Sequence, residues 1–321
     1  MNTIEEKNLH GERFYKIGFW IILFFSVIFR LPFLGAERMW PDEALYAWAA
    51  KRIFLHPELI FSKEIMDFHP PLFSILLSIG HFFFSPLMAC HLSVFLINIL
   101  GIVLIYFLGI KIQGRFLGCF AAMVLSFNLE YFKVSNFILI DGVVSVFTIL
   151  FFYVLTGVDH RRITRQDFLL GFMVMALILL KWSGGLVLPF IFIYYLLAFP
   201  ELTFCNRILR SFIPLMFGAF LVGILLWHNH EILGTWIPKV FGQANDYYRE
   251  SFYYYYDYST DYIFIVQLMP FLIFGLWLSL KSRDRDFWVQ GFWVVFAFLM
   301  ISAMPSKDFR DRKSTRLNSS H

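Results

Sequence analysis

Hydrophobic positions along the chain are gathered into long apolar runs that alternate with short polar connections. The runs cover residues 17–34, 69–84, 88–110, 115–130, 142–157, 167–181, 184–199, 209–228, 262–280 and 287–304. A helix needs about 17–25 mainly apolar residues to cross the hydrocarbon core of a bilayer, and most of the runs are suited to this. The pattern therefore predicts an all-α fold, a polytopic transmembrane helical bundle.

Basic residues in the short connections set the expected orientation of this bundle. Four connections are basic, at 111–115, 160–165, 207–210 and 281–285. Cytoplasmic loops carry the excess of Lys and Arg, so all four belong inside. This arrangement requires one early run not to cross. The run 69–84 begins His69-Pro70-Pro71 and contains Gly80. We therefore predict that it is a juxtamembrane or re-entrant helix on the outer side.

The overall composition agrees with a membrane protein. Hydrophobic residues make up 59% of the 321 positions and charged residues only 16%, whereas soluble domains contain about 25% charged residues. The net charge of +4 lies in the short loops, so it indicates orientation, and no nucleic-acid partner is expected. The three cysteines fit neither a disulfide framework nor a metal-binding spacing.

The first outer loop, residues 35–87, contains the most distinctive polar sequence. Pro41 is followed by Asp42 and Glu43, and a helix over 42–54 is expected because proline and acidic residues favour the first turn. Leu45, Trp48, Ala49 and Ile53 would form its apolar stripe, so the helix is predicted to lie along the membrane surface. A carboxylate there can accept a proton from an acceptor group. Taken alone, however, the acidic pair is more often a simple helix start.

Further polar residues stand at the outer ends of the apolar runs. His69 precedes the two prolines as a possible phosphate or substrate contact, with a solvated helix-start histidine as the alternative. Asp141 stands at the mouth of the run 142–157, where it is either functional or a helix cap. Lys181 lies between two apolar runs, and it is expected either to pair with an anion such as a lipid phosphate or to snorkel.

The outer loop 229–261 combines aromatic and polar residues. Arg249 and the run Tyr253–Tyr256 suit a phosphate and a sugar ring, although interfacial tyrosine belts are commoner. His228, His230 and Glu231 match no standard metal spacing. No cofactor is predicted with certainty, and a divalent metal remains possible.

The order of these features resembles that of the integral membrane glycosyltransferases of the GT-C fold. Within that fold it is similar to the family of dolichyl-phosphate-mannose–protein mannosyltransferases and bacterial aminoarabinose–lipid A transferases. The resemblance rests on Pro41-Asp42-Glu43-Ala44-x-Tyr46-Ala47, the Pro-Pro-Leu that follows His69, Asp141 opening a later span, and the Lys181-x-x-Gly184 hairpin. It covers residues 17–310, and many members have Lys where this chain has His69.

The resemblance implies the transfer of a hexosyl or pentosyl group from a polyprenyl-phosphate-linked sugar. The acceptor would be a lipid, glycan or protein on the non-cytoplasmic side of a prokaryotic inner membrane. Asp42 would be the catalytic general base, and Glu43, also counted among the catalytic residues, a neighbouring acid that orients the substrate or the base. The substrate-binding residues implied are Tyr46, His69, Asp141, Lys181 and Arg249, the last two holding the carrier phosphate.

Two other functions are compatible with parts of the sequence. A transporter or flippase of a lipid-linked substrate would place charged residues near the bilayer midplane and often shows inverted repeats. Here the apolar runs are nearly free of charge and no repeat is evident. A non-catalytic scaffold would not bring Asp42, Asp141 and Lys181 together.

The last eleven residues, 311–321, read DRKSTRLNSSH. This string matches the translation of a common sequencing-library adapter, so we expect it not to be native and exclude it from the fold. The expected organisation is a cytoplasmic tail at 1–16 and a transmembrane glycosyltransferase domain at 17–310, which would be cut short near Arg310. Lys307 and Arg310 begin a basic-aromatic motif of the kind found late in the family.

Overall fold

The structure, a computed structural model, is helical throughout the part of the chain that it describes. That part comprises residues 2–34, 41–66, 70–159, 162–181, 184–185, 187–199 and 201–227, all within the compact unit Met1–His230. The helices are α1 (Asn2–Arg30), η1 (Leu31–Phe33), α2 (Pro41–Leu55), η2 (Pro57–Leu59), α3 (Lys63–Met66), α4 (Leu72–Ile79), η3 (Gly80–Phe82), α5 (Pro86–Gln113), α6 (Arg115–Phe127), α7 (Leu129–Asn136), α8 (Ile140–Leu155), α9 (Arg165–Leu180), α10 (Val187–Ala198) and α11 (Phe204–Trp227).

Three of the described helices are long and apolar enough to cross a membrane. Their candidate spans are Glu12–Phe33, Pro86–Gln113 and Phe204–Ile224, which agree with the predicted runs 17–34, 88–110 and 209–228. Helices α6, α8, α9 and α10 also coincide with predicted runs, but they have only 12 to 16 residues. The chain is an integral membrane protein, and the crossing of these shorter helices stays a prediction.

The run 69–84 forms no helix that could cross. Helix α4 has eight residues, which gives a rise of about 12 Å against the ~30 Å of hydrocarbon. The short helix η3 follows it, and α5 begins at Pro86. These short helices agree with the prediction of a non-crossing element, and the flanking prolines account for the break in helical geometry. The position of the run relative to the membrane stays a prediction.

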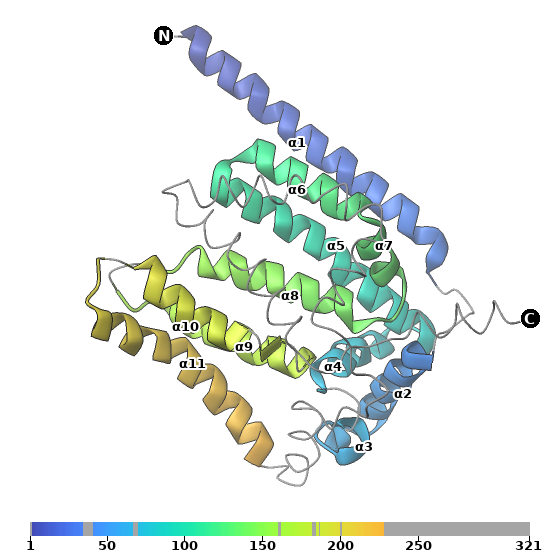
Figure 1. Cartoon of the computed structure of the whole chain (residues 1–321). Helices are drawn as coiled ribbons and strands as arrows, with labels where there is room; N and C mark the ends of the chain where they lie inside the picture. Colours follow the sequence, from blue (N-terminus) through green and yellow to red (C-terminus); the bar gives the residue numbers. More distant parts are fainter. Residues whose placement is uncertain are drawn as a thin grey trace, which may run out of the picture. The chain divides into compact units, whose positions relative to one another are not determined.

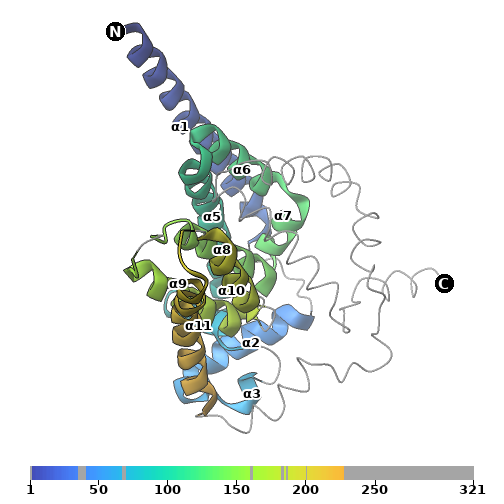
Figure 2. The same ribbon diagram turned by 60° about the vertical axis from the view of Figure 1, so that its left-hand side comes forward.

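The order in which the helices lie beside one another in space differs from their order along the chain. Helix α1 contacts α6, α6 contacts α5, α5 contacts α8, α8 contacts α9, and α11 packs against both α9 and α10 (Figure 1). Helices α2 and α4 pack on one another, and they also contact α5. They lie where α5 and α8 begin and α9 ends, and the turned view keeps α2 below these ends (Figure 2).

A buried arginine joins α1 to α6 and α7. Arg30 is 1% exposed; it donates from Nη2 to the Ser126 carbonyl at 3.0 Å and from Nε to Ser135 Oγ at 2.8 Å. The last carbonyls of a helix lack intrahelical partners and carry partial negative charge, so Ser126 at the end of α6 suits a guanidinium. Arg30 thereby fixes α7, the helix that precedes Asp141.

A tyrosine also anchors α7, from its other side. The hydroxyl of Tyr131 donates to the Asn98 carbonyl of α5 at 2.8 Å. Burial raises the pKa of Tyr131, so the hydroxyl stays a neutral donor over the physiological range. The sequence did not predict α7, because Asn128 interrupts the apolar run 115–130: its side chain accepts from the Tyr131 amide at 2.8 Å and caps a new helix.

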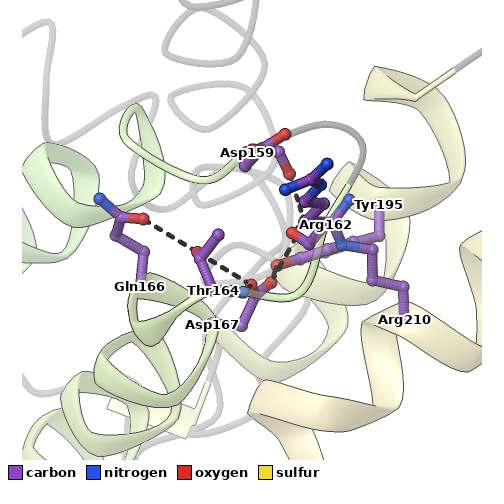
Figure 3. A network of polar contacts seen from close by, with 7 residues as sticks. All are labelled: Asp159, Arg162, Thr164, Gln166, Asp167, Tyr195 and Arg210. Carbon is purple, nitrogen blue, oxygen red and sulfur yellow. Dashed lines mark hydrogen bonds and ion pairs between the residues drawn. The ribbon is translucent and has the colours of Figure 1, made fainter.

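The beginning of α9 is held by a buried polar network (Figure 3). The Asp167 carboxylate, 0% exposed, accepts from the Thr164 amide at 2.7 Å and from the Tyr195 hydroxyl at 2.8 Å. Arg210 of α11 lies 3.7 Å from the same carboxylate, and it also donates to the carbonyls of Asp159 and Arg162. A single acidic residue therefore joins α9, α10 and α11.

The apolar stripe predicted for α2 is divided between the interior of the protein and its surface. Ala49 and Ile53 are buried, whereas Trp48 is 40% exposed and Leu45 is only partly buried. The buried positions also include Glu43 and Tyr46. This face is buried because α2 packs against α4 and α5, and the position of the helix along the membrane surface stays a prediction.

Candidate active site

An apolar cluster, here called the site core, joins the elements that carry the predicted site residues. It consists of Tyr46, Ala50, Phe73, Leu77, Cys90, Val94, Ile138, Ile140, Val143 and Leu180. Three of its members stand beside polar candidates in the chain: Tyr46 is one turn after Asp42, Ile140 precedes Asp141, and Leu180 precedes Lys181. Packing of the site core therefore brings these three positions to one end of the helices.

Asp141 and Lys181 form an ion pair across the two helices. The Lys181 Nζ donates to Asp141 Oδ1 at 2.6 Å, and the side chains are 33% and 56% exposed respectively. Asp141 lies in the first turn of α8, whereas Leu139 is the N-cap. The side chain of Asp141 therefore does not cap α8, which was the alternative to a functional role. Lys181 has found an anionic partner as expected, and that partner is a carboxylate of the protein.

Glu43 connects α2 to the segment that leads into α8. Its side chain is 0% exposed, and Oε1 accepts from the Ile138 amide at 2.7 Å. Ile138 is three residues before Asp141, a separation of at most about 10 Å along an extended chain. Through this contact Glu43 positions the segment 137–139. Because Asp42 is next to Glu43 in the chain, the contact also places Asp42 and Asp141 in the same region of the protein.

Asp42 and Tyr46 flank Glu43 on the same helix with different exposure. Asp42 is half-buried in the first turn of α2. Tyr46 is 5% exposed, and its ring packs edge-on against Phe73 with 4.8 Å between centroids. The roles of these side chains toward a substrate stay predictions, and the geometry makes Tyr46 a member of the site core first.

His91 is a polar residue at this site that the sequence reasoning missed. It lies in the second turn of α5, is 3% exposed, and neither ring nitrogen has a hydrogen-bond partner in the part of the chain that is described. Its imidazole lies near the side chain of Glu43 and the backbone of Asn136. The available signal was an ionisable side chain inside an otherwise apolar run.

Several predicted positions lie outside the described residues. These are His69 and Arg249, together with the possible metal ligands His228, His230 and Glu231. Within the described ranges, no group of three or more His, Cys, Asp and Glu side chains has the geometry to hold a metal ion. The ionisable side chains that the described part of the site supplies are carboxylates, a lysine and a buried imidazole.

This set of groups fits a reaction that separates charge at a membrane boundary. Asp42 and the half-exposed Asp141 supply negative charge, and Lys181 supplies a cation with two N–H bonds beyond the one that Asp141 accepts. A cation beside an apolar core stabilises charge that develops on a leaving group. Glu43 and His91 are buried, 0% and 3% exposed, and Glu43 holds the segment that precedes Asp141.

Comparison with solved structures identifies the fold. A crystal structure of ArnT from Cupriavidus metallidurans in the apo state matches with a TM-score of 0.65 and 18% identity, over 90% of this chain and 56% of that chain. The structure of the same ArnT bound to undecaprenyl phosphate matches with a TM-score of 0.66 and 16% identity, over the same shares. The chain therefore has an ArnT-like GT-C fold, as the sequence resemblance predicted.

The match to ArnT covers only part of that protein, and it is a match of structure, not of sequence. The chain spans little more than half of the length of the ArnT that it matches. No protein-family model matches the sequence, and no curated protein matches it.

Proposed function

We propose that this chain transfers a glycosyl group from a polyprenyl-phosphate-linked sugar to an acceptor on the non-cytoplasmic side of the membrane. The observation that carries the proposal is the convergence of Asp42, Asp141 and Lys181 around one core, on a fold shared with ArnT. One of the matching ArnT structures is bound to undecaprenyl phosphate, and this supports a polyprenyl phosphate as the carrier.

The proposed reaction is a displacement at the anomeric carbon of the sugar. A hydroxyl or amine of the acceptor forms the new bond to this carbon while Asp42 takes its proton. The bond between the carbon and the phosphate oxygen breaks, and its electron pair stays on the carrier phosphate. Attack from the side opposite the leaving group inverts the configuration of the sugar.

Lys181 has the proposed role of stabilising the leaving phosphate. Its ammonium is held by Asp141 at 2.6 Å, which fixes its position without using all of its N–H bonds. Arg249 is proposed as a second phosphate contact. The segment held by Glu43 and Arg30 places Asp141, so both buried residues act on the reaction through that carboxylate.

Asp42→Asn tests the proposal. The assay is consumption of a polyprenyl-phosphate sugar in membranes that contain the protein. We expect a loss of about 100-fold or more, as for removal of a positioned general base. The matched control is Glu64→Gln, which removes an exposed carboxylate from the same loop. A near wild-type rate for Asp42→Asn would overturn the assignment of the base.

The same membranes distinguish the transporter alternative. A flippase moves the carrier-linked sugar across the bilayer without breaking its phosphate bond. Appearance of intact donor on the opposite face, with no free carrier phosphate formed, would favour that function over glycosyl transfer.

A further inference from the structure

A shallow hollow lies on α9 and α11, at the end of α9 opposite the site core. Arg165 and Gln166 stand at its polar end, and Phe168, Leu169, Phe172 and Phe217 form its apolar wall. The proposed glycosyl transfer makes no use of these residues. The hollow combines a cation with an apolar surface, and the protein lies in a bilayer. A ligand of the hollow therefore needs an anionic group for the cation and an apolar part for the surface.

The apolar wall is open and rigidly built. Phe168, Leu169 and Phe172 are 45% to 48% exposed, and the rings of Phe168 and Phe217 pack edge-on at 5.7 Å between centroids. Helices α9 and α11 approach closely here: a Cβ added to Gly171 would lie 2.8 Å from the Pro214 carbonyl oxygen. Any larger residue at 171 would separate the two helices and remove the wall.

The cation at the polar end has no partner among the residues that the structure describes. No described residue forms an ion pair or hydrogen bond with the side chain of Arg165, which is exposed. The acidic residue nearest to it in sequence, Asp167, is fully buried and engaged with Thr164 and Tyr195. Arg165 therefore presents an uncompensated positive charge next to the apolar wall.

The loop before α9 is fixed in a way that favours binding. Arg210 donates to the carbonyls of Asp159 and Arg162, and Asp167 accepts from the Thr164 amide (Figure 3). These contacts hold the backbone at Asp159 and Arg162 against α11 and fix Thr164 at the beginning of α9. The position of the cation is thereby set in advance, so little ordering is needed when a ligand arrives.

We propose that this hollow binds an anionic phospholipid of the surrounding bilayer. The phosphate meets Arg165 and the amide of Gln166, and an acyl chain lies along Phe168, Phe172 and Phe217. From 165 to 172 the helix rises about 10 Å, so cation and apolar wall follow one another as headgroup and chain do. A zwitterionic lipid fills the same wall but leaves the charge of Arg165 poorly compensated.

The basic character of this end of the bundle and the surrounding membrane both favour an anionic lipid as the ligand of the hollow. The hollow is at the end of the bundle where the basic connections 160–165 and 207–210 lie, and basic pockets between membrane helices bind anionic headgroups. The same positions are expected on the cytoplasmic side, whereas the site core is expected on the other side. The lipid is therefore a different molecule from the sugar carrier, and this proposal does not depend on the proposed reaction.

Native mass spectrometry of the full chain in detergent tests the proposal. The measured quantity is the ratio of bound phosphatidylglycerol to bound phosphatidylethanolamine, offered together with identical acyl chains. We expect a preference for phosphatidylglycerol that falls about fivefold in Arg165→Gln, the effect of one basic residue near a membrane surface. Arg165→Lys keeps the charge and is expected to keep most of the preference.

Two further variants make the result specific to the hollow. Lys51→Gln removes an exposed cation from α2 and is expected to leave the preference unchanged. Phe172→Gln is expected to weaken binding of both lipids alike, because it interrupts the apolar wall. The proposal is overturned if Arg165→Gln retains the wild-type preference, if Lys51→Gln lowers it equally, or if Phe172→Gln leaves the binding of both lipids unchanged. Retention of a polypeptide in place of lipid would also overturn it.

Discussion

Helix α9 has a carboxylate–cation pair near each end, and the two pairs are built differently. At its beginning, Asp167 and Arg210 are 0% and 7% exposed with 3.7 Å between the charged atoms (Figure 3). At its end, Lys181 and Asp141 are 33% and 56% exposed with 2.6 Å between them. The shorter contact is thus the more exposed one.

The difference shows that distance is a poor guide to what an ion pair does. Solvent screens the Asp141–Lys181 pair, so the pair contributes little to stability, and its exposure leaves the Lys181 ammonium accessible to an anionic substrate. The Asp167 carboxylate has lost its water and depends on hydrogen bonds from Thr164 and Tyr195. We infer that the buried pair serves the fold and the exposed pair serves the site.

The largest effect is expected from breaking the buried pair. Asp167→Asn leaves the guanidinium of Arg210 buried without a neutralising charge, and we expect the free energy of unfolding to fall by about 3 kcal/mol. Chemical unfolding of the full chain in micelles measures this. The control is Asp141→Asn, for which the same measurement should change by less than about 1 kcal/mol. Equal losses in the two variants would remove the distinction between the pairs.

The second largest effect is expected on the rate of sugar transfer, when the exposed Asp141–Lys181 pair is broken. Lys181→Gln removes the cation proposed to stabilise the leaving phosphate, and we expect the turnover rate to fall about 100-fold. Stability should change by less than about 1 kcal/mol, since the pair is exposed. Lys181→Arg should recover part of the rate because the charge is kept. A variant that is inactive only because it unfolds would contradict the assignment of this pair to the site.

Local patterns in the sequence predicted most of the described helices and singled out the acidic residues at their ends, whose roles stay predictions. The prolines around 70 predicted a break, and Asp42 and Glu43 predicted the beginning of α2; both agree with the structure. Asp141 and Lys181 were each recognised as isolated charges at the end of a run. Such features depend on neighbouring residues alone, so a single sequence is sufficient to find them.

Features that depend on packing between distant segments were not predictable in the same way. Trp48, Ala49 and Ile53 were placed on one stripe of α2, but the contact with α4 and α5 buries Ala49 and Ile53 and leaves Trp48 exposed. The pairing of Asp141 with Lys181 joins residues 40 positions apart. The burial of Glu43 depends on an amide at Ile138, 95 positions away. Hydropathy carries no information on which distant segments meet.

An intermediate effect is expected where the fold and the site meet. Glu43→Leu leaves the buried amide of Ile138 without its acceptor, which costs about 1–3 kcal/mol of unfolding free energy. Glu43→Gln keeps an oxygen for that amide, so most of the stability should remain. Thermal unfolding of the two variants, followed in parallel, measures the difference. If both lose the same stability, the negative charge of Glu43 matters and the hydrogen bond does not.

The smallest effect is expected at an exposed ion pair outside the site. Arg52 and Glu64 are 38% and 42% exposed with 3.1 Å between the charged atoms, so this pair matches Asp141–Lys181 in exposure. Arg52→Gln should change the unfolding free energy by less than about 1 kcal/mol, and the rate of sugar transfer should stay at the wild-type value. Lys181→Gln and Arg52→Gln each remove one positive charge from a pair of similar exposure. A difference between their transfer rates would therefore come from the position of the cation in the protein. A comparable loss of activity in Arg52→Gln would mean that general surface charge, and not a cation beside the site core, supports the reaction.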